Sequence, residues 1–111
     1  MEHVIVTGGS SGIGLSIARL YAKEGHNVTI IARRKLILKK ARKLLLSDQI
    51  TKGQEILTLS ADVTNLRDIN DAIEMSVKKL GTPHRLFVSA GRVSPGYFQE
   101  IALSDFRSDM D

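Results

Sequence analysis

Closely spaced glycines and serines near the start of the chain could bind a phosphate group. Residues 6–16 read VTGGSSGIGLS and lie between a short apolar run and a helical pattern. Glycine allows positive φ angles and close backbone approach, and a helix that follows offers free amides to an anion. We predict a nucleotide-phosphate loop with Ser10 and Ser11 as additional hydroxyl donors. Its glycines are Gly8, Gly9, Gly12 and Gly14.

This loop has two other interpretations. A P-loop requires a lysine after its second glycine, and the interval from Gly9 to Gly14 has the right length. Leu15 occupies the lysine position, so a nucleoside triphosphatase is not expected. A glycine-rich turn without a ligand stays open, although the strand–loop–helix context disfavours it.

The segment after the second predicted strand indicates which dinucleotide would bind. It reads Ile-Ala-Arg-Arg-Lys over residues 31–35 and contains no acidic residue. An NAD site places a carboxylate there to accept a hydrogen bond from the ribose 2′-hydroxyl. A guanidinium instead suits a 2′-phosphate, so we predict NADP(H) bound by Arg33 and Arg34. The other basic residues up to Lys43 are interpreted as a solvated helix face.

Hydrophobic periodicity predicts the elements that position these residues. Strands are expected at 4–6, 28–31, 55–61 and 86–88, alternating with helices at 13–23, 34–46 and 66–80 and a helix start near 104–105. Such alternation predicts parallel strands joined by right-handed crossovers. The expected fold class is α/β: one Rossmann-type, doubly wound domain over residues 1–111, truncated to about four strands and three to four helices. The residues expected to face inward are Ile13, Ile17, Leu20 and Tyr21 in the first helix, and Ile37, Ala41, Leu44 and Leu45 in the second.

Composition excludes several classes of function. The 111 residues are 42% hydrophobic and 25% charged, as in ordinary globular proteins, and they include no cysteine. Three scattered histidines have no metal-ligand spacing, so no metal site is predicted. Seven of the 16 basic residues lie between Arg33 and Lys43 without interleaved aromatics, which disfavours nucleic-acid stacking; a basic surface that binds anionic lipid stays an alternative. The start does not resemble a secretory leader, so we expect a cytoplasmic location.

The spacing Thr7-Gly8-x-x-x-Gly12-x-Gly14 resembles the signature TGxxxGxG of the short-chain dehydrogenase/reductase family. The arginine after the second strand, an Asp-Val pair after the third and Ser-Ala-Gly after the fourth match further family motifs. The family usually has asparagine where Ser89 stands, and many members have a lysine at the position of Ile37. The resemblance implies a cofactor site of Thr7, Gly8, Gly9, Ser10, Ser11, Gly12, Ile13, Gly14, Arg33, Arg34, Asp62, Val63, Ser89, Ala90 and Gly91, in which Asp62 and Val63 hold the adenine.

Within the family, residues 30–33 and 89–101 look like the 3-ketodihydrosphingosine reductases. That similarity implies an NADPH-dependent reduction of a keto group in sphingolipid synthesis, on a long-chain keto-lipid. It also implies the cytosolic face of the endoplasmic reticulum, if a membrane anchor exists outside this segment.

The family's catalytic residues are a Tyr-x-x-x-Lys pair, a serine and an asparagine. Tyr21 and Tyr97 are followed four residues later by Gly25 and Ile101, so no catalytic residue is predicted. We therefore expect the NADP(H)-binding half of a reductase, inactive without its catalytic half. The alternative is a non-catalytic NADP(H)-binding module or regulatory subunit. An open edge on the fourth strand predicts association, including homo-oligomers.

Overall fold

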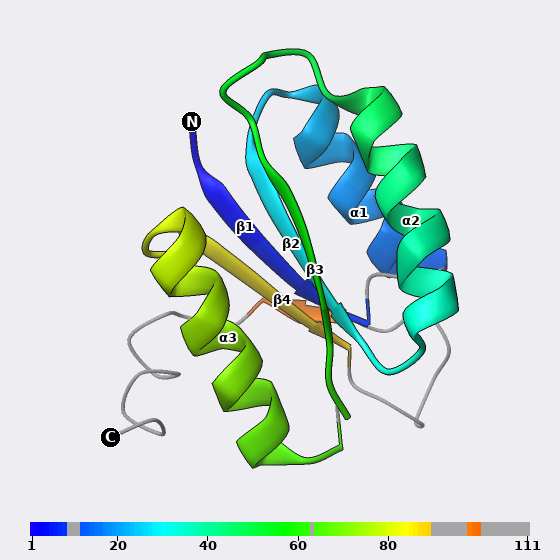
Figure 1. Cartoon of the computed structure of the whole chain (residues 1–111), viewed down its shortest axis with the longest axis vertical. Coiled ribbons are helices and arrows are strands. Elements are labelled where there is room, and N and C mark those ends of the chain that lie inside the picture. The colour runs from blue at the N-terminus through cyan, green and yellow to red at the C-terminus, as the bar shows by residue number, and fades with distance from the viewer. Residues whose placement is uncertain (9–11, 63, 90–97, 101–111) are drawn as a thin grey trace.

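Five strands form a single mixed sheet at the centre of the molecule. The computed structural model describes residues 1–8, 12–62, 64–89 and 98–100, so the helix start expected near residue 104 lies outside the described residues. The strand order is β3-β2-β1-β4-β5, with β1 in the middle (Figure 1). The first four strands are parallel, and β5 is antiparallel to β4. Their bounds are β1 His3–Thr7, β2 Asn27–Ala32, β3 Ile56–Ser60, β4 Arg85–Ser89 and β5 Phe98–Glu100.

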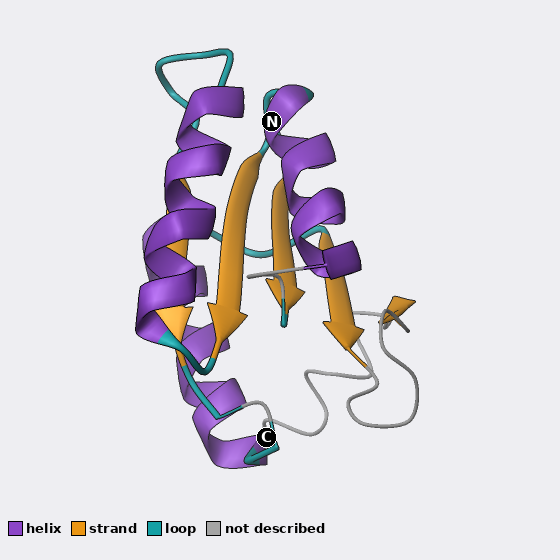
Figure 2. Ribbon diagram, turned by 90° about the vertical axis from the view of Figure 1, so that its right-hand side faces the viewer, coloured by secondary structure: helices purple, strands orange, loops and turns teal. Residues whose placement is uncertain are grey.

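Helices cover both faces of this sheet, as Figure 2 shows. Helices α1 (Gly12–Lys23) and α2 (Lys35–Asp48) pack on one face, and α3 (Leu66–Leu80) packs on the other. The predicted doubly wound α/β fold with about four parallel strands is confirmed. No helix among the described residues is long and apolar enough to cross a membrane.

The side chains of β1 alternate between two hydrophobic clusters. Val4 and Val6 belong to the cluster beneath α1 and α2, whereas Ile5 belongs to the cluster beneath α3. All three are fully buried, and each such side chain contributes about 1.5–3 kcal/mol by leaving water. A strand buried on both faces explains why β1 and β2 read as continuous apolar runs.

The predicted inward stripe of α1 is wrong in part. Ile13 and Leu20 are 48% and 54% exposed, and the buried positions are Gly14, Ala18 and Ala22. These small residues recur every four positions and let the helix lie close to the bulky side chains of β1 and β2. Hydrophobicity alone pointed to the larger residues, but the short distance between helix and sheet selects the smaller ones.

Helix α2 shows a similar correction. Leu44 is 39% exposed, and Leu38 is buried together with Ala41 and Leu45. One ion pair joins α2 to the neighbouring helix: the Arg19 Nε atom donates to Asp48 Oδ2 at 2.8 Å. This hydrogen bond lowers the pKa of the Asp48 carboxyl and raises that of the arginine.

Helix α3 begins and ends where the sequence predicts. The side chain of Asn65 accepts the backbone N–H of Asp68 at 3.2 Å, so this residue is the N-cap. Gly81 ends the helix at φ 88°, which a glycine adopts without strain.

The open edge predicted for the fourth strand is covered in this structure. Strand β5 pairs with β4 across the residues from Phe87 to Ser89. Strand β5 is not among the strands predicted from the sequence, because a strand of three residues gives no periodic signal. Over the described residues, the edge strands of the sheet are therefore β3 on one side and β5 on the other.

Candidate functional site

The predicted site residues follow the carboxyl ends of neighbouring parallel strands. In the ladder, Thr7 at the end of β1 pairs with Ile31 of β2 and with Val88 of β4. The Gly8 N–H donates to the Ile31 carbonyl at 2.6 Å, which fixes the start of the glycine loop against β2. Ligands of open α/β sheets bind outside this edge, where connections diverge to opposite faces.

The glycine loop contains backbone conformations that favour glycine. Gly8 has φ 75° and Gly12 has φ 63°. A Cβ atom built on Gly12 would meet nothing within 4 Å, so the backbone angle and not lack of space requires glycine there. Gly9, Ser10 and Ser11 lie outside the described residues.

The N-terminus of α1 supplies an anion-binding end. Amides of its first turn have no helical acceptor, and that turn carries no acidic side chain to neutralise the helix dipole. Ile13 is half exposed, and Gly14 is buried against the sheet. This arrangement of backbone donors fits a pyrophosphate.

Two arginines lie just beyond β2. Arg33 and Arg34 are exposed, and neither forms an ion pair with a carboxylate among the residues that the structure describes. Ser60 Oγ donates to the Arg33 carbonyl at 3.1 Å and joins this segment to the end of β3. Arg34 is the N-cap residue of α2 in an extended conformation. Both guanidinium groups are available for an anionic group of a ligand.

The carboxylate of Asp62 is engaged in a local turn. Its Oδ1 atom accepts the Thr64 N–H at 2.9 Å and the Thr64 hydroxyl at 2.6 Å. The Asp62 N–H in turn donates to Asp68 Oδ2 at 3.4 Å. These bonds order the connection from β3 to α3. Contact with an adenine ring stays a prediction, and Val63 lies outside the described residues.

The fourth group of predicted residues is described only at its start. Ser89 is the last residue of β4, whereas Ala90 and Gly91 lie outside the described residues. The strands that precede the predicted site residues thus end at the same edge of the sheet. Contacts between these side chains and a cofactor stay predictions.

Two residues that organise this edge form contacts that were not predicted from the sequence. They are Ser60, which anchors the Arg33 carbonyl, and Thr64, which donates twice to Asp62. The Asp-x-Thr spacing is typical of a side-chain-capped turn and could have identified Thr64. Nothing in the sequence indicates the Ser60 contact, because it joins residues 27 positions apart.

The histidines have structural surroundings at the opposite, amino edge of the sheet. His3 is buried, with Nδ1 2.9 Å from the Gly81 carbonyl and Nε2 2.8 Å from Thr29 Oγ1. Burial lowers the pKa of this imidazole. Among the described residues, no group of three or more acidic, histidine or cysteine side chains could hold a metal ion.

A parallel sheet with a glycine-rich loop, a free helix N-terminus and basic residues at its carboxyl edge defines a dinucleotide-binding α/β domain. Residues 2–111 match the family model described as short chain dehydrogenase, and the chain belongs to this family. The predicted family membership is confirmed.

Similar proteins agree with this assignment. The chain is 37% identical over 109 residues to a 3-ketodihydrosphingosine reductase of Mus musculus, a match that covers 97% of this chain and 33% of the relative. It is 30% identical to L-sorbose reductase from Gluconobacter frateurii, solved with NADPH and L-sorbose, with a TM-score of 0.74 over 94% of this chain and 38% of that one. An actinorhodin polyketide ketoreductase solved with NADPH is 35% identical, with a TM-score of 0.73 over 82% of this chain and 33% of that one. The chain thus spans about a third of the length of these proteins.

Proposed function

We propose that this chain forms the NADP(H)-binding part of a short-chain reductase. The observation that carries the proposal is the pair of exposed arginines directly after β2, where an NAD-selective site would have a carboxylate. A guanidinium binds a 2′-phosphate through charge-assisted hydrogen bonds, which the bare 2′-hydroxyl of NAD(H) does not offer. The NADPH-bound relatives support the same cofactor.

The donor chemistry of the described residues fits this cofactor. The first-turn amides of α1 would hold the pyrophosphate, with Gly8 and Gly12 allowing close approach of the backbone. Arg33 and Arg34 would hold the 2′-phosphate. When bound, NADPH supplies the hydride for reduction of a ketone.

The proposed substrate is the keto group of a long-chain amino ketone of sphingoid-base synthesis. The support is the name of the mouse relative, to which 97% of this chain is similar. Since the chain spans a third of that relative, the substrate belongs to the proposal for the whole protein. The proposed location is the cytoplasm, or the cytosolic face of the endoplasmic reticulum if an anchor lies outside this segment.

A second candidate is a non-catalytic NADP(H)-binding module or regulatory subunit. It is favoured by the surroundings of Tyr21, whose ring is half-buried and packs against Phe87 and His26 with centroids 5.8 and 5.9 Å away. Tyr21 is thus a packing residue on α1, with Gly25 where a family lysine would stand. Tyr97 lies outside the described residues.

The cofactor proposal is tested by measuring dissociation constants for NADPH and NADH. The parent should prefer NADPH, and Arg33→Ala should weaken NADPH binding about tenfold or more, because one charge-assisted bidentate contact is lost. Arg33→Asp should shift the preference toward NADH. Lys40→Ala, a charge change on the exposed face of α2, is the matched control and should bind like the parent. Equal affinities in the parent, or unchanged NADPH affinity in Arg33→Ala, would reject the proposal.

The two candidates differ in turnover. NADPH oxidation is measured with a long-chain 3-keto amine, first with residues 1–111 and then with any longer product of the same gene. We expect no turnover from residues 1–111, since they contain no Tyr-x-x-x-Lys pair. Turnover by a longer product would support the reductase, whereas NADPH binding without turnover in every form would support the binding module.

A further inference from the structure

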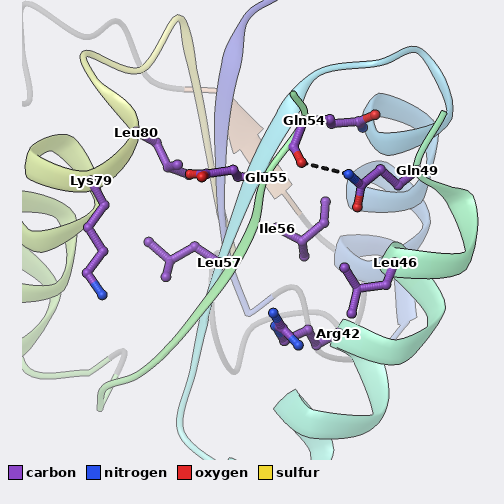
Figure 3. Close-up of a pocket in the computed structure, with 9 residues that line it drawn as sticks. All are labelled: Arg42, Leu46, Gln49, Gln54, Glu55, Ile56, Leu57, Lys79 and Leu80. Atoms are coloured by element: carbon purple, nitrogen blue, oxygen red, sulfur yellow. Dashed lines mark hydrogen bonds between the residues drawn. The ribbon is translucent and has the colours of Figure 1, made fainter. Parts of the chain in front are cut away.

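The outer edge of β3 lies in a trough between two helices. Strand β3 is the last strand of the sheet on this side, with α2 above one face and α3 above the other. Figure 3 shows Arg42 and Leu46 reaching this edge from α2, and Lys79 and Leu80 reaching it from α3. These side chains line a cavity of about 290 Å³ beside the start of β3.

The backbone of β3 has unused hydrogen-bonding groups along this trough. The Val28 N–H donates to the Glu55 carbonyl at 3.1 Å, and the Ala61 N–H donates to the Ala32 carbonyl at 2.9 Å. The backbone N–H and C=O groups of the odd-numbered residues of this strand therefore point toward β2. Because alternate residues of a strand point their N–H and C=O groups to opposite sides, those of the even-numbered residues face outward. These are Ile56, Thr58 and Ser60, and no described residue pairs with their backbone groups.

The charged side chains on the α2 wall of the trough are all basic among the residues that line the cavities. Lys35, Lys39 and Arg42 recur at helical spacings of four and three residues, which places them on one face of α2. All three line a second cavity of about 280 Å³ together with the Thr58 and Ser60 side chains. The opposite wall is mixed, with Asp68, Asp71 and Met75 beside the end of β3. An occupant that fits this trough has acidic side chains on the α2 side only.

We propose that the β3 edge binds an extended peptide that adds an antiparallel strand and carries acidic side chains at alternate positions. In an antiparallel pair, directly opposed residues place their side chains on the same face of the sheet. Residues opposite Ile56, Thr58 and Ser60 would therefore point toward α2. Alternate side chains of a strand are roughly 7 Å apart, and Lys35 and Arg42 are separated by roughly 10 Å along the helix, so two to three carboxylates match the basic wall.

A second copy of this chain is a poorer occupant. Two β3 edges paired antiparallel would be related by a two-fold axis perpendicular to the sheet, which keeps each face on the same side. The basic wall of one α2 would then lie beside the basic wall of the other, and like charges oppose such a contact.

The test uses residues 1–111 and a fluorescent nine-residue peptide in which glutamate alternates with valine or threonine. Anisotropy should show saturable binding that weakens as salt rises, and a peptide with lysine in place of glutamate should not bind. Arg42→Glu and Lys39→Glu should each weaken peptide binding about tenfold. Each change replaces attraction between a basic side chain of α2 and a peptide glutamate, partly shielded from water, by repulsion between two carboxylates. Lys40→Glu, which carries the same charge change roughly 160° around the helix from Arg42, should bind like the parent.

Backbone methylation separates strand addition from charge attraction. N-methylation of the glutamate amides should abolish binding, since these amides face β3 in the antiparallel register, and N-methylation of the intervening residues should leave it unchanged. Equal effects of the two methylations, equal effects of Arg42→Glu and Lys40→Glu, or no binding at low salt would overturn the proposal. So would a dimer in sedimentation equilibrium that the peptide does not displace, because the edge would then hold a second copy.

Discussion

Substitutions at Gly12 separate backbone strain from steric crowding in the glycine loop. Gly12 has φ 63°, and a Cβ atom there would meet nothing within 4 Å. An alanine therefore costs only the strain of the left-handed conformation, about 1–2 kcal/mol. For a domain of this size that corresponds to a fall in melting temperature of roughly 4–16 °C. Asparagine tolerates this conformation better than alanine, so Gly12→Asn should lose less stability than Gly12→Ala despite its larger side chain.

The assay is thermal and urea unfolding of the parent, Gly12→Ala and Gly12→Asn, each with and without NADPH. Gly53→Ala is the control, because Gly53 is exposed outside the positive φ range and its Cβ would make only an ordinary 4.0 Å contact with Met1. It should be neutral or stabilising by up to about 1 kcal/mol. If Gly12→Asn unfolds more easily than Gly12→Ala, space rather than φ limits this position and the reasoning is wrong. An unchanged stability of Gly12→Ala would refute it as well.

Three further outcomes are expected. Burial lowers the pKa of His3 below its ordinary value of 6.5, so protonation of this imidazole favours the unfolded chain. The free energy of unfolding should be at its full value above pH 6.5 and should fall below that pH by at most about 1.4 kcal/mol per pH unit, as measured by chemical denaturation at pH 5–8. A His3→Asn variant with the same pH slope would contradict this expectation. Gly14→Val should abolish NADPH binding, because Gly14 is buried where α1 meets the sheet, and isothermal titration of the folded variant with unchanged affinity would reject the phosphate-loop assignment. Gln54→Leu should lower the free energy of unfolding by about 3 kcal/mol, because the buried amide donates to the Ala22 and His26 carbonyls at 2.7 and 2.8 Å. A loss below about 1 kcal/mol in urea unfolding would show that water replaces these hydrogen bonds.

The sequence predicts most of the fold because its strongest signals are local. Apolar runs mark β1 and β2, and Asn65 and Gly81 mark the ends of α3 through bonds within a few residues. The errors concern tertiary distances. Ile13 and Leu20 are exposed because α1 lies close to the sheet. Hydrophobic periodicity does not predict the distance between a helix and a sheet.

For the candidate site, the sequence predicts which strand ends matter but not what holds them. The residues after β1, β2 and β3 come together at one edge because parallel strands share their direction. The Ser60 bond to the Arg33 carbonyl depends on the pairing of β2 with β3, which a linear pattern does not reveal. The sequence resemblance implies a cofactor contact for Asp62, but it does not indicate that the carboxylate of this residue also accepts a hydrogen bond within its own turn.

The close seating of α1 on Gly14, Ala18 and Ala22 limits how this protein can diverge. A larger residue at any of these positions would push the helix and its amides away from the phosphates, so one change would damage stability and cofactor binding together. Arg33 is exposed and lies beyond the last buried residue of β2, so it can change with little effect on packing. Selection could therefore exchange one dinucleotide for the other at a solvent-facing position, while the phosphate end of the site stays fixed by the core.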